Sequence, residues 1–256
     1  MRWGAEVTYS IIGRDGRTGE IGVAVASRFF ACGALVPHVG PRTAVATQAF
    51  VNPLWGVEGL RRLEAGEMAG DVLADFVARD GGQAIRQCHM MDATGRIAAH
   101  TGADCVDWAG HRTGGDHSVA GNMLVGQAVI DATFETFADR NDLDLPHRLL
   151  AAMRAGEAAG GDRRGRQAAG LKVHRGQAYA HLDLRVDDHG DPLSELDRLL
   201  DVAAERYLHL VDALPTEEDF SGATDRAPID AAIVADERRR REAGRASRSL
   251  ARPGGV

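Results

Sequence analysis

The sequence has few cysteines and no long hydrophobic run. Its three cysteines, Cys32, Cys88 and Cys105, are odd in number and lack CxxC spacing. This excludes a disulfide scaffold and a paired-cysteine zinc site, and it fits a reducing compartment. No apolar run approaches the roughly 18–20 residues that a membrane span requires, and we find no charged-then-apolar leader. We therefore expect a cytoplasmic protein without a membrane partner.

Positive charge and aromatic area are also scarce. The formal net charge of −7 argues against nucleic-acid binding, because phosphate neutralisation needs a basic face. Aromatic residues make up 5% of the chain and hydrophobic residues 44%, so small side chains must fill much of the core. At 256 residues the chain is long enough for one domain with a sizeable core.

Two short runs of β-branched and apolar residues stand near the start of the chain. Residues 7–13 and 20–26 flank the segment Arg14-Asp15-Gly16-Arg17-Thr18-Gly19. Asp-Gly followed by a second Gly is typical of a hairpin turn, because Gly readily adopts a positive φ. The pattern predicts an antiparallel hairpin with Thr8 at the head of its first strand.

Later segments alternate between strands and pairs of helices. Periodicity and caps predict strands at residues 43–50, 84–91, 96–101, 168–174 and 181–186, and helices at residues 53–64, 68–77, 127–139, 146–159 and 193–210. The segment from Gly102 to Asn122 is rich in Gly, His and Asp and lacks a stripe, which favours an irregular, lid-like loop. This order favours an α+β fold, with two stacked, mainly antiparallel sheets and helices on both outer faces.

Metal and cysteine chemistry find little support in the spacing of the residues. His100, His111 and His117 match no compact ligand pattern, and Asp187, Asp188 and His189 are typical of a turn before a helix. Buried single cysteines usually behave as small hydrophobes. We therefore expect no cofactor and no metal. Cys32 as the nucleophile, His38 as a catalytic group, and a metal-dependent hydrolase built on Asp187, Asp188, His189 and a loop histidine remain open alternatives.

A Thr at the head of a strand–turn–strand that ends in Ala-Ser-Arg resembles the N-terminal nucleophile (Ntn) hydrolases, the proteasome β-subunit superfamily. There the first residue of the mature chain is both nucleophile and base. A hydroxyl alone is a weak nucleophile, but a neutral α-amine beside it can take its proton. The α-amine has a reference pKa of about 7.7–8.0, close to the working pH. The resemblance implies a four-layer α-β-β-α sandwich.

In the sequence as written, Thr8 carries a peptide bond to Val7 in place of that amine. Self-cleavage between the two residues would expose the amine. A translation start at position 7 would do so as well, because a GTG start codon reads as valine on paper and the initiator methionine is then removed. We favour the second route.

Several motifs together resemble an uncharacterised bacterial family, domain of unknown function 1028, which is grouped with the Ntn hydrolases. They are Thr8-Tyr9-Ser10-Ile11, Gly22-Val23-Ala24-Val25-Ala26-Ser27, Ala44-Val45-Ala46-Thr47-Gln48, Gly121-Asn122-Met123-Leu124, Gly160-Gly161-Asp162-Arg163-Arg164-Gly165-Arg166-Gln167 and Asp183-Leu184-Arg185-Val186-Asp187-Asp188-His189. Members usually begin Met-Thr, so residues 1–7 are an extension. We expect an Ntn-like domain over residues 8–214 and a helix with a flexible tail, or an arm onto a second subunit, over residues 215–256.

The resemblance implies roles for particular residues. The catalytic candidates are Thr8 as nucleophile, Ser27 and Arg28 beside it, and Asn122, and the substrate-binding candidates are Thr47, Gln48, Asp162 and Arg163. Asn122, or a backbone amide near Thr47 and Gln48, would stabilise the oxyanion. Asp162 and Arg163 would orient the substrate or the amine. Arg28 or His38 would supply the positive charge that a lysine supplies in the proteasome.

We therefore expect an amide hydrolase that acts on a small amide or peptide-like substrate through an acyl-enzyme, in a homo-oligomer. The alternative is a non-enzymatic Ntn-like binding or assembly module. A module has no need of a free amine at Thr8, so the mature N-terminus discriminates between the two.

Overall fold

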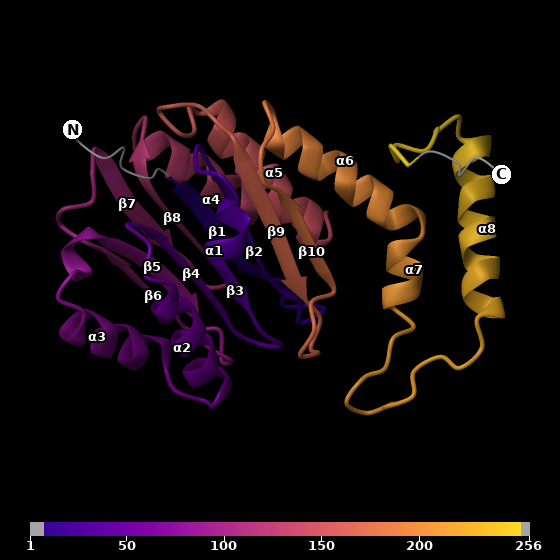
Figure 1. Cartoon of the computed structure of the whole chain (residues 1–256), viewed down its shortest axis with the longest axis horizontal. Coiled ribbons are helices and arrows are strands. Elements are labelled where there is room, and N and C mark those ends of the chain that lie inside the picture. Colours follow the sequence, from indigo (N-terminus) through magenta and orange to yellow (C-terminus); the bar gives the residue numbers. More distant parts are fainter. Residues whose placement is uncertain (1–7, 252–256) are drawn as a thin grey trace. The chain divides into compact units, whose positions relative to one another are not determined.

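The computed structural model describes residues 8–251, which divide into two units after Leu196. The first unit holds a six-stranded sheet of order β10-β9-β2-β1-β8-β7 and a four-stranded sheet of order β3-β4-β5-β6, both antiparallel (Figure 1). The expected α+β class is confirmed. The expected extension, residues 1–7, lies outside the described residues. Within residues 8–251 no helix has both the length and the apolar character to cross a membrane.

The elements follow one another in short steps. The strands are β1 (Thr8–Arg14), β2 (Ile21–Ser27), β3 (Pro37–Val39), β4 (Ala44–Ala49), β5 (Arg86–Met91), β6 (Ile97–Thr101), β7 (Trp108–Thr113), β8 (His117–Leu124), β9 (Ala168–His174) and β10 (Leu182–Val186). The helices are α1 (Cys32–Leu35), α2 (Pro53–Glu64), α3 (Ala69–Arg79), the 3-10 turn η1 (Gln83–Ile85), α4 (Gln127–Asp139), α5 (Leu145–Ala158), α6 (Pro192–Glu205), α7 (Tyr207–Val211) and α8 (Ala227–Glu242).

The predicted first hairpin is confirmed. Its turn closes where the Asp15 amide donates to the Glu20 carbonyl at 2.9 Å, and Gly19 adopts a φ of +76°. β1 pairs with β2 on one side and with β8 on the other. It therefore lies inside the six-stranded sheet, with neighbours on both edges.

The expected loop between Gly102 and Asn122 is wrong, because this segment holds most of the β7–β8 hairpin. Ser118, Ala120 and Asn122 alternate with residues that face the helices, so polar side chains stand on a buried face and hide the strand pattern. The His117 ring instead packs against Phe134, with ring centroids 4.0 Å apart. Within residues 8–251 no group of three or more His, Cys, Asp or Glu side chains could hold a metal ion.

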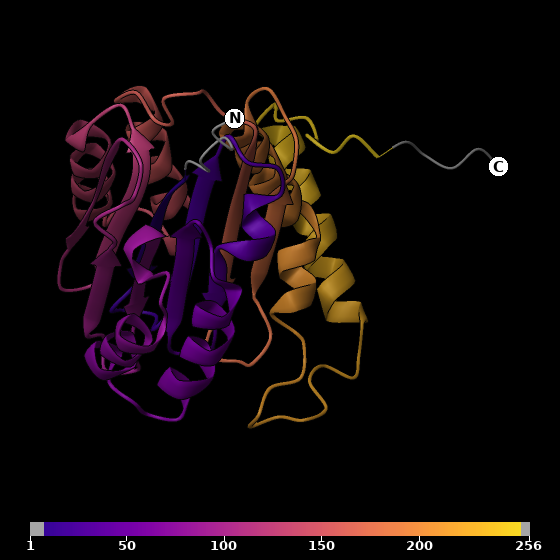
Figure 2. The same ribbon diagram turned by 60° about the vertical axis from the view of Figure 1, so that its left-hand side comes forward.

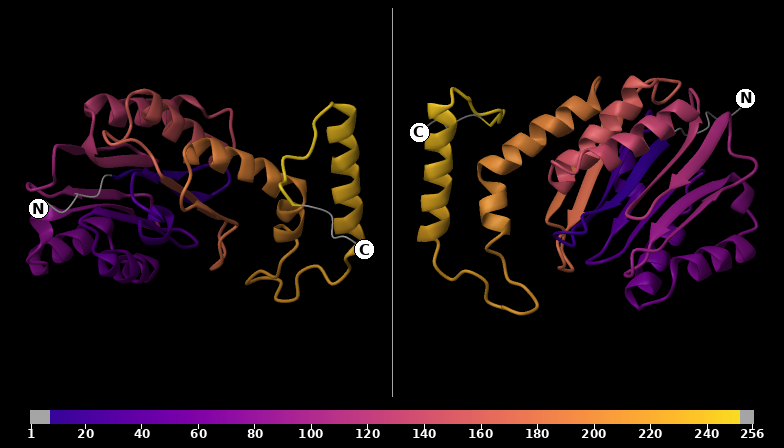
Figure 3. Two further views of the ribbon diagram at one scale, coloured as in Figure 1. Left: turned by 45° about the horizontal axis from the view of Figure 1, so that its top comes forward. Right: turned by 180° about the vertical axis from the view of Figure 1, so that it is seen from behind.

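Helices cover the outer face of each sheet. α4 and α5 pack on the six-stranded sheet, and α2 and α3 pack on the four-stranded sheet (Figure 3). The Asn52 side chain caps α2 by accepting the Leu54 amide at 3.1 Å, as predicted. The cluster beneath α2 and α3 consists of Val45, Trp55, Leu63, Ala69, Val72, Leu73, Phe76, Cys88 and Met90.

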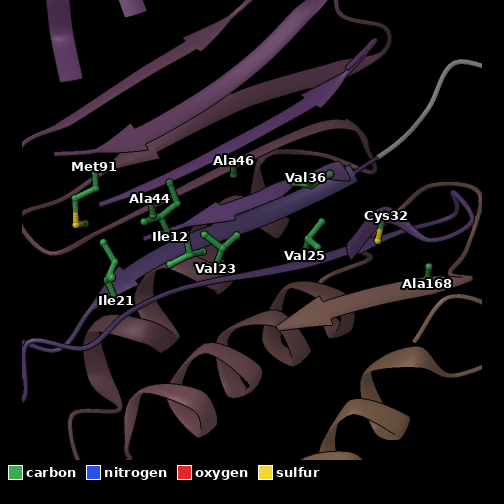
Figure 4. Close-up of a cluster of buried hydrophobic side chains, with 11 residues drawn as sticks. Ile12, Ile21, Val23, Val25, Cys32, Val36, Ala44, Ala46, Met91 and Ala168 are labelled. Atoms are coloured by element: carbon green, nitrogen blue, oxygen red, sulfur yellow. The ribbon is translucent and has the colours of Figure 1, made fainter. Parts of the chain in front are cut away.

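One half of the space between the two sheets is apolar. Alternate residues of β1, β2, β4 and β5 meet there (Figure 4). The buried cluster is Ile12, Ile21, Val23, Val25, Cys32, Val36, Val39, Ala44, Ala46, Met91 and Ala168. These side chains are small or branched, so the low aromatic content of the chain is compatible with a closed core.

The other half of this space, toward the head of β1, is polar and equally buried. Ser10 donates to the Gln48 Oε1 at 2.6 Å and lies 2.9 Å from the His89 Nε2. The other His89 ring nitrogen lies 2.6 Å from the Ser118 Oγ. Burial lowers the pKa of His89 to about 3, so its imidazole is neutral and hydrogen-bonded on both sides.

The second unit, from Asp197 onward, consists of helices and an irregular loop between α7 and α8 (Figure 2). The predicted single helix over 193–210 is interrupted, because Arg206 has a non-helical φ of −146°. The basic run in α8 is ion-paired: Arg240 and Arg241 contact Asp236 and Glu237 at 2.9 and 2.6 Å. We interpret the run as an ion-paired helix surface.

Replacing Gly170 by Ala should destabilise the first unit. A Cβ there would lie 2.7 Å from the Gly33 Cα, so α1 must move away from β9. Such overpacking costs about 1–3 kcal/mol. Gly190→Ala is the matched control, since nothing lies within 4 Å of its Cβ position. Denaturant unfolding measures both variants, and equal stability would contradict the close backbone contact.

Stability should fall as the pH drops below about 6.5, the reference pKa of histidine. His89 stays neutral in the folded chain down to a pKa of about 3, whereas it binds a proton in the unfolded chain. The unfolded state therefore gains protons over this window, with a slope of up to about 1.4 kcal/mol per pH unit.

The comparison of the wild type with His89→Gln isolates this contribution, because the other histidines are common to both proteins. Gln can still hydrogen-bond to Ser10 and Ser118. The free energy of unfolding is measured between pH 4 and 6.5. Parallel pH profiles for the two proteins would show that His89 is charged in the folded state.

Candidate functional site

The candidate site lies where β1 begins and β2 and β8 end. In the antiparallel register Thr8 faces Ser27 of β2 on one side and Asn122 of β8 on the other. Gln48, near the end of β4 in the opposite sheet, also reaches this point, since its amide donates to the Thr8 carbonyl at 3.4 Å. Four of the eight predicted site residues therefore meet at one end of the sheets.

Thr8 is held by both its hydroxyl and its carbonyl. Its Oγ1 donates to the Ser27 Oγ at 3.2 Å, and the Asn122 Nδ2 donates to its carbonyl at 3.3 Å. Ser27 in turn accepts the Phe29 amide at 3.0 Å. Only 4% of Thr8 is exposed. A hydroxyl so fixed in position is suited to react with a group placed against it.

Three buried side-chain amides lie beneath Thr8. The Gln87 Oε1 accepts from the Gln48 Nε2 at 2.8 Å and from the Asn122 Nδ2 at 3.0 Å. The Gln87 Nε2 donates to the Gly121 carbonyl at 2.8 Å. We call Gln48, Gln87 and Asn122 the amide cluster.

One atom of the amide cluster has no partner. Asn122 is 1% exposed, and its Oδ1 is buried without a hydrogen bond. Its Nδ2 already donates to the Thr8 carbonyl and to Gln87. A buried acceptor without a donor is costly. An N–H or ammonium donor beside Thr8 would satisfy it.

Asp162 fastens the end of β2 to the loop before β9. Its carboxylate accepts the backbone amides of Arg28 and Arg164, each at 2.8 Å. The Arg28 guanidinium donates to the Arg164 carbonyl at 2.6 Å. Gly160, with a φ of +122°, lets this loop turn. Asp162 therefore positions the residue that follows Ser27.

Two predicted site residues point elsewhere. The Thr47 hydroxyl donates to the Asn52 carbonyl at 3.3 Å, at the start of α2. Arg163 is exposed and forms an ion pair with Asp107 at 3.4 Å. Neither side chain has a hydrogen bond to Thr8, Ser27 or the amide cluster among the interactions of residues 8–251.

The alternative chemistries find their residues in structural roles. Burial raises the pKa of Cys32 to about 12, so its thiol is a poor nucleophile. Burial also lowers the pKa of His38, which therefore favours the neutral form. Asp187 forms an ion pair with Arg185 at 2.8 Å, and the His189 Nδ1 accepts the Asp191 amide at 2.9 Å.

A pocket of about 120 Å³ adjoins the amide cluster. It is lined by Ala49, Phe50, Ile85, Asp104, Cys105, Val106, Asn122 and Met123. Ala49 and Met123 have positive φ angles of 65° and 50°. Strained backbone of this kind is frequent at binding sites. Asn122 belongs both to the pocket and to the contacts of Thr8.

The residues that sequence reasoning missed are Gln87, Ser10 and His89. Gln87 and His89 alternate with Cys88 and Met90 along β5. Two polar side chains on one face of a strand between apolar residues were the available signal, but a solvent-exposed face gives the same pattern.

The family model described as Family of unknown function (DUF1028) matches residues 8–196. Among solved structures, the chain is similar to the crystal structure of protein SPO2555 from Silicibacter pomeroyi, which carries the same family model. The identity is 32% and the TM-score 0.79, over 86% of this chain and 96% of that one. No curated protein matches the chain. The matched residues contain Thr8, both sheets and the amide cluster, and the chain belongs to the DUF1028 family.

Proposed function

We propose that this protein is an N-terminal-threonine amide hydrolase, with Thr8 as both nucleophile and base. The observation that carries the proposal is the position of Thr8. It heads β1 at the polar end of the space between the sheets, with its Oγ1 3.2 Å from the Ser27 Oγ and its carbonyl held by the amide cluster. The Ntn resemblance of the sequence requires a threonine at this position.

The layering supports the same proposal. α2 and α3 pack outside one sheet, and α4 and α5 pack outside the other. This succession fits a four-layer α-β-β-α sandwich of the Ntn type. In that fold the nucleophile lies at the end of a central strand, as Thr8 does between β2 and β8.

The proposed reaction begins when the α-amine of a mature Thr8 takes the hydroxyl proton. Oγ1 attacks the substrate carbonyl, and the C–N bond of the resulting tetrahedral intermediate breaks. The leaving amine takes the proton from the α-ammonium, and an ester of Thr8 remains. Water, deprotonated by the same amine, then cleaves the ester and releases the carboxylic acid. Ser27 orients Oγ1 throughout, because it accepts the Thr8 hydroxyl in the resting state.

Asn122 is better suited to hold the amine than the oxyanion. Its Nδ2 is already engaged, and its Oδ1 lacks a donor. An α-ammonium at Thr8 would supply that donor. We therefore assign the oxyanion to a backbone amide near Gln48, a contribution worth about 2.7–4 kcal/mol per donor.

The substrate that we propose is a small amide or peptide-like molecule. Asp162 acts as a positioning residue, since backbone amides occupy its carboxylate. Arg28 and Arg163 are exposed and would meet the part of the substrate that extends into solvent. A homo-oligomer stays a prediction.

The competing proposal is a binding module with the same fold. It follows if Val7 remains attached, because an amide nitrogen at Thr8 cannot accept the proton of the hydroxyl.

The first test is the intact mass of the protein made from its native gene context, followed by substitution of Thr8. We expect a chain that begins at Thr8. In a screen of amide substrates, Thr8→Ala should lose roughly 10⁶-fold in rate, the scale found when a hydrolase nucleophile is removed. Thr8→Ser should keep part of the activity. Thr18→Ala, in the exposed first turn, is the matched control.

A mature chain that retains Val7, or a Thr8→Ala variant as active as Thr18→Ala, would overturn the hydrolase proposal. Circular dichroism of each variant shows whether a loss of activity reflects a loss of fold.

The activity of the mature enzyme should rise with pH to a plateau. The α-amine must be neutral to act as base, and its reference pKa is about 7.7–8.0. Burial favours the neutral form and lowers this pKa, so kcat/KM should level off at or below about pH 8. A flat profile between pH 5.5 and 9 would contradict the amine as base.

A further inference from the structure

We propose that the 120 Å³ pocket beside Asn122 is the subsite for a neutral, branched apolar group attached to the substrate carbonyl. This inference rests on the proposed function, because it places that carbonyl at Thr8. It names the substrate class of the site, amides of medium-sized aliphatic acids.

The first support is the continuity of the pocket with Thr8. Asn122 lines the pocket and is the cross-strand partner of Thr8. Its Nδ2 lies 3.3 Å from the Thr8 carbonyl oxygen. A group attached to a carbonyl at Thr8 therefore has the pocket as a neighbouring cavity.

The second support is the chemistry of the walls. Phe50, Ile85, Val106 and Met123 offer apolar side chains to the pocket, and Phe50 and Val106 keep 65% and 46% of their surface exposed. Large apolar side chains left accessible around a cavity are typical of a ligand site. They gain their burial when a ligand covers them.

The third support is size and charge. A cavity of roughly 150 Å³ in another protein accepts benzene, so 120 Å³ fits a branched chain of about four or five carbons. The Asp104 carboxylate at the lining disfavours a second carboxylate. The group is therefore neutral and aliphatic.

Cys105 makes this pocket measurable without any turnover. It lines the pocket and is partly exposed, whereas Cys32 and Cys88 are buried. Burial raises the pKa of Cys105, so its alkylation by iodoacetamide is slow at neutral pH and is followed at alkaline pH. A ligand that fills the pocket should protect this thiol.

The experiment measures alkylation of Cys105 in the full-length Thr8→Ala variant, which removes hydrolysis from the result. The probes are acetamide, 4-methylpentanamide and glutaramate, which differ in apolar length and in a terminal carboxylate. We expect 4-methylpentanamide to protect Cys105, with its affinity rising about fourfold for each methylene added to acetamide, the factor for burial of one methylene. Glutaramate should give no protection.

Val106→Trp, built into the same variant, should fill the pocket and abolish protection. Val57→Trp is the matched control, because Val57 is exposed on α2 and does not line the pocket. Thermal unfolding shows that each variant is folded.

Equal protection by all three probes, or none by 4-methylpentanamide, would overturn the subsite whether or not the enzyme hydrolyses amides. Protection by 4-methylpentanamide alone, combined with no amide cleavage by the mature wild type, would support the pocket and overturn the hydrolase proposal. If the wild type does cleave amides, its kcat/KM should be highest for the branched acyl group, and Val106→Trp should shift the preference to acetyl.

Discussion

The amide cluster is the constraint on which the site depends. Gln48 and Gln87 come from one sheet and Asn122 from the other, and their hydrogen bonds of 2.8 and 3.0 Å join the sheets in a water-free space. Leaving one such group unpaired costs about 1–3 kcal/mol, so a shift of either sheet at this end is opposed. The Thr8 carbonyl belongs to the same network, and the nucleophile is therefore placed by contacts from both sheets.

The space between the sheets divides stability and chemistry between its two halves. The apolar half, from Ile12 to Met91, holds the sheets together through burial of hydrocarbon. The polar half contributes little net stability, because its hydrogen bonds replace hydrogen bonds to water. It provides a set of fixed dipoles and one neutral imidazole, His89. Such a preoriented, dry surrounding is what stabilises a developing charge.

Local signals in the sequence predicted the hairpin and most of the helices, because Gly19 and Asn52 act within a few residues of their partners. The same reasoning brought Thr8, Ser27, Gln48 and Asn122 to one site. It failed at β8, where Ser118 and Asn122 are buried polar residues whose partners lie far away in the chain. Gln87 was missed for the same reason, since its role depends on Gly121 and Asn122. Residue type alone does not show whether a polar side chain faces water or another sheet.

The surroundings of Thr8 also bear on how its amine would be kept neutral. The Arg28 guanidinium donates to the Arg164 carbonyl, and the pKa of His38 is lowered by burial, so neither group stands in for the lysine of the proteasome site. Burial itself acts in the required direction, because removing water disfavours an ammonium group. The Asn122 Oδ1 acts in the opposite direction by accepting a hydrogen bond from the charged form. The balance between desolvation and this one acceptor, rather than a neighbouring cation, would set the basicity of the nucleophile's own amine.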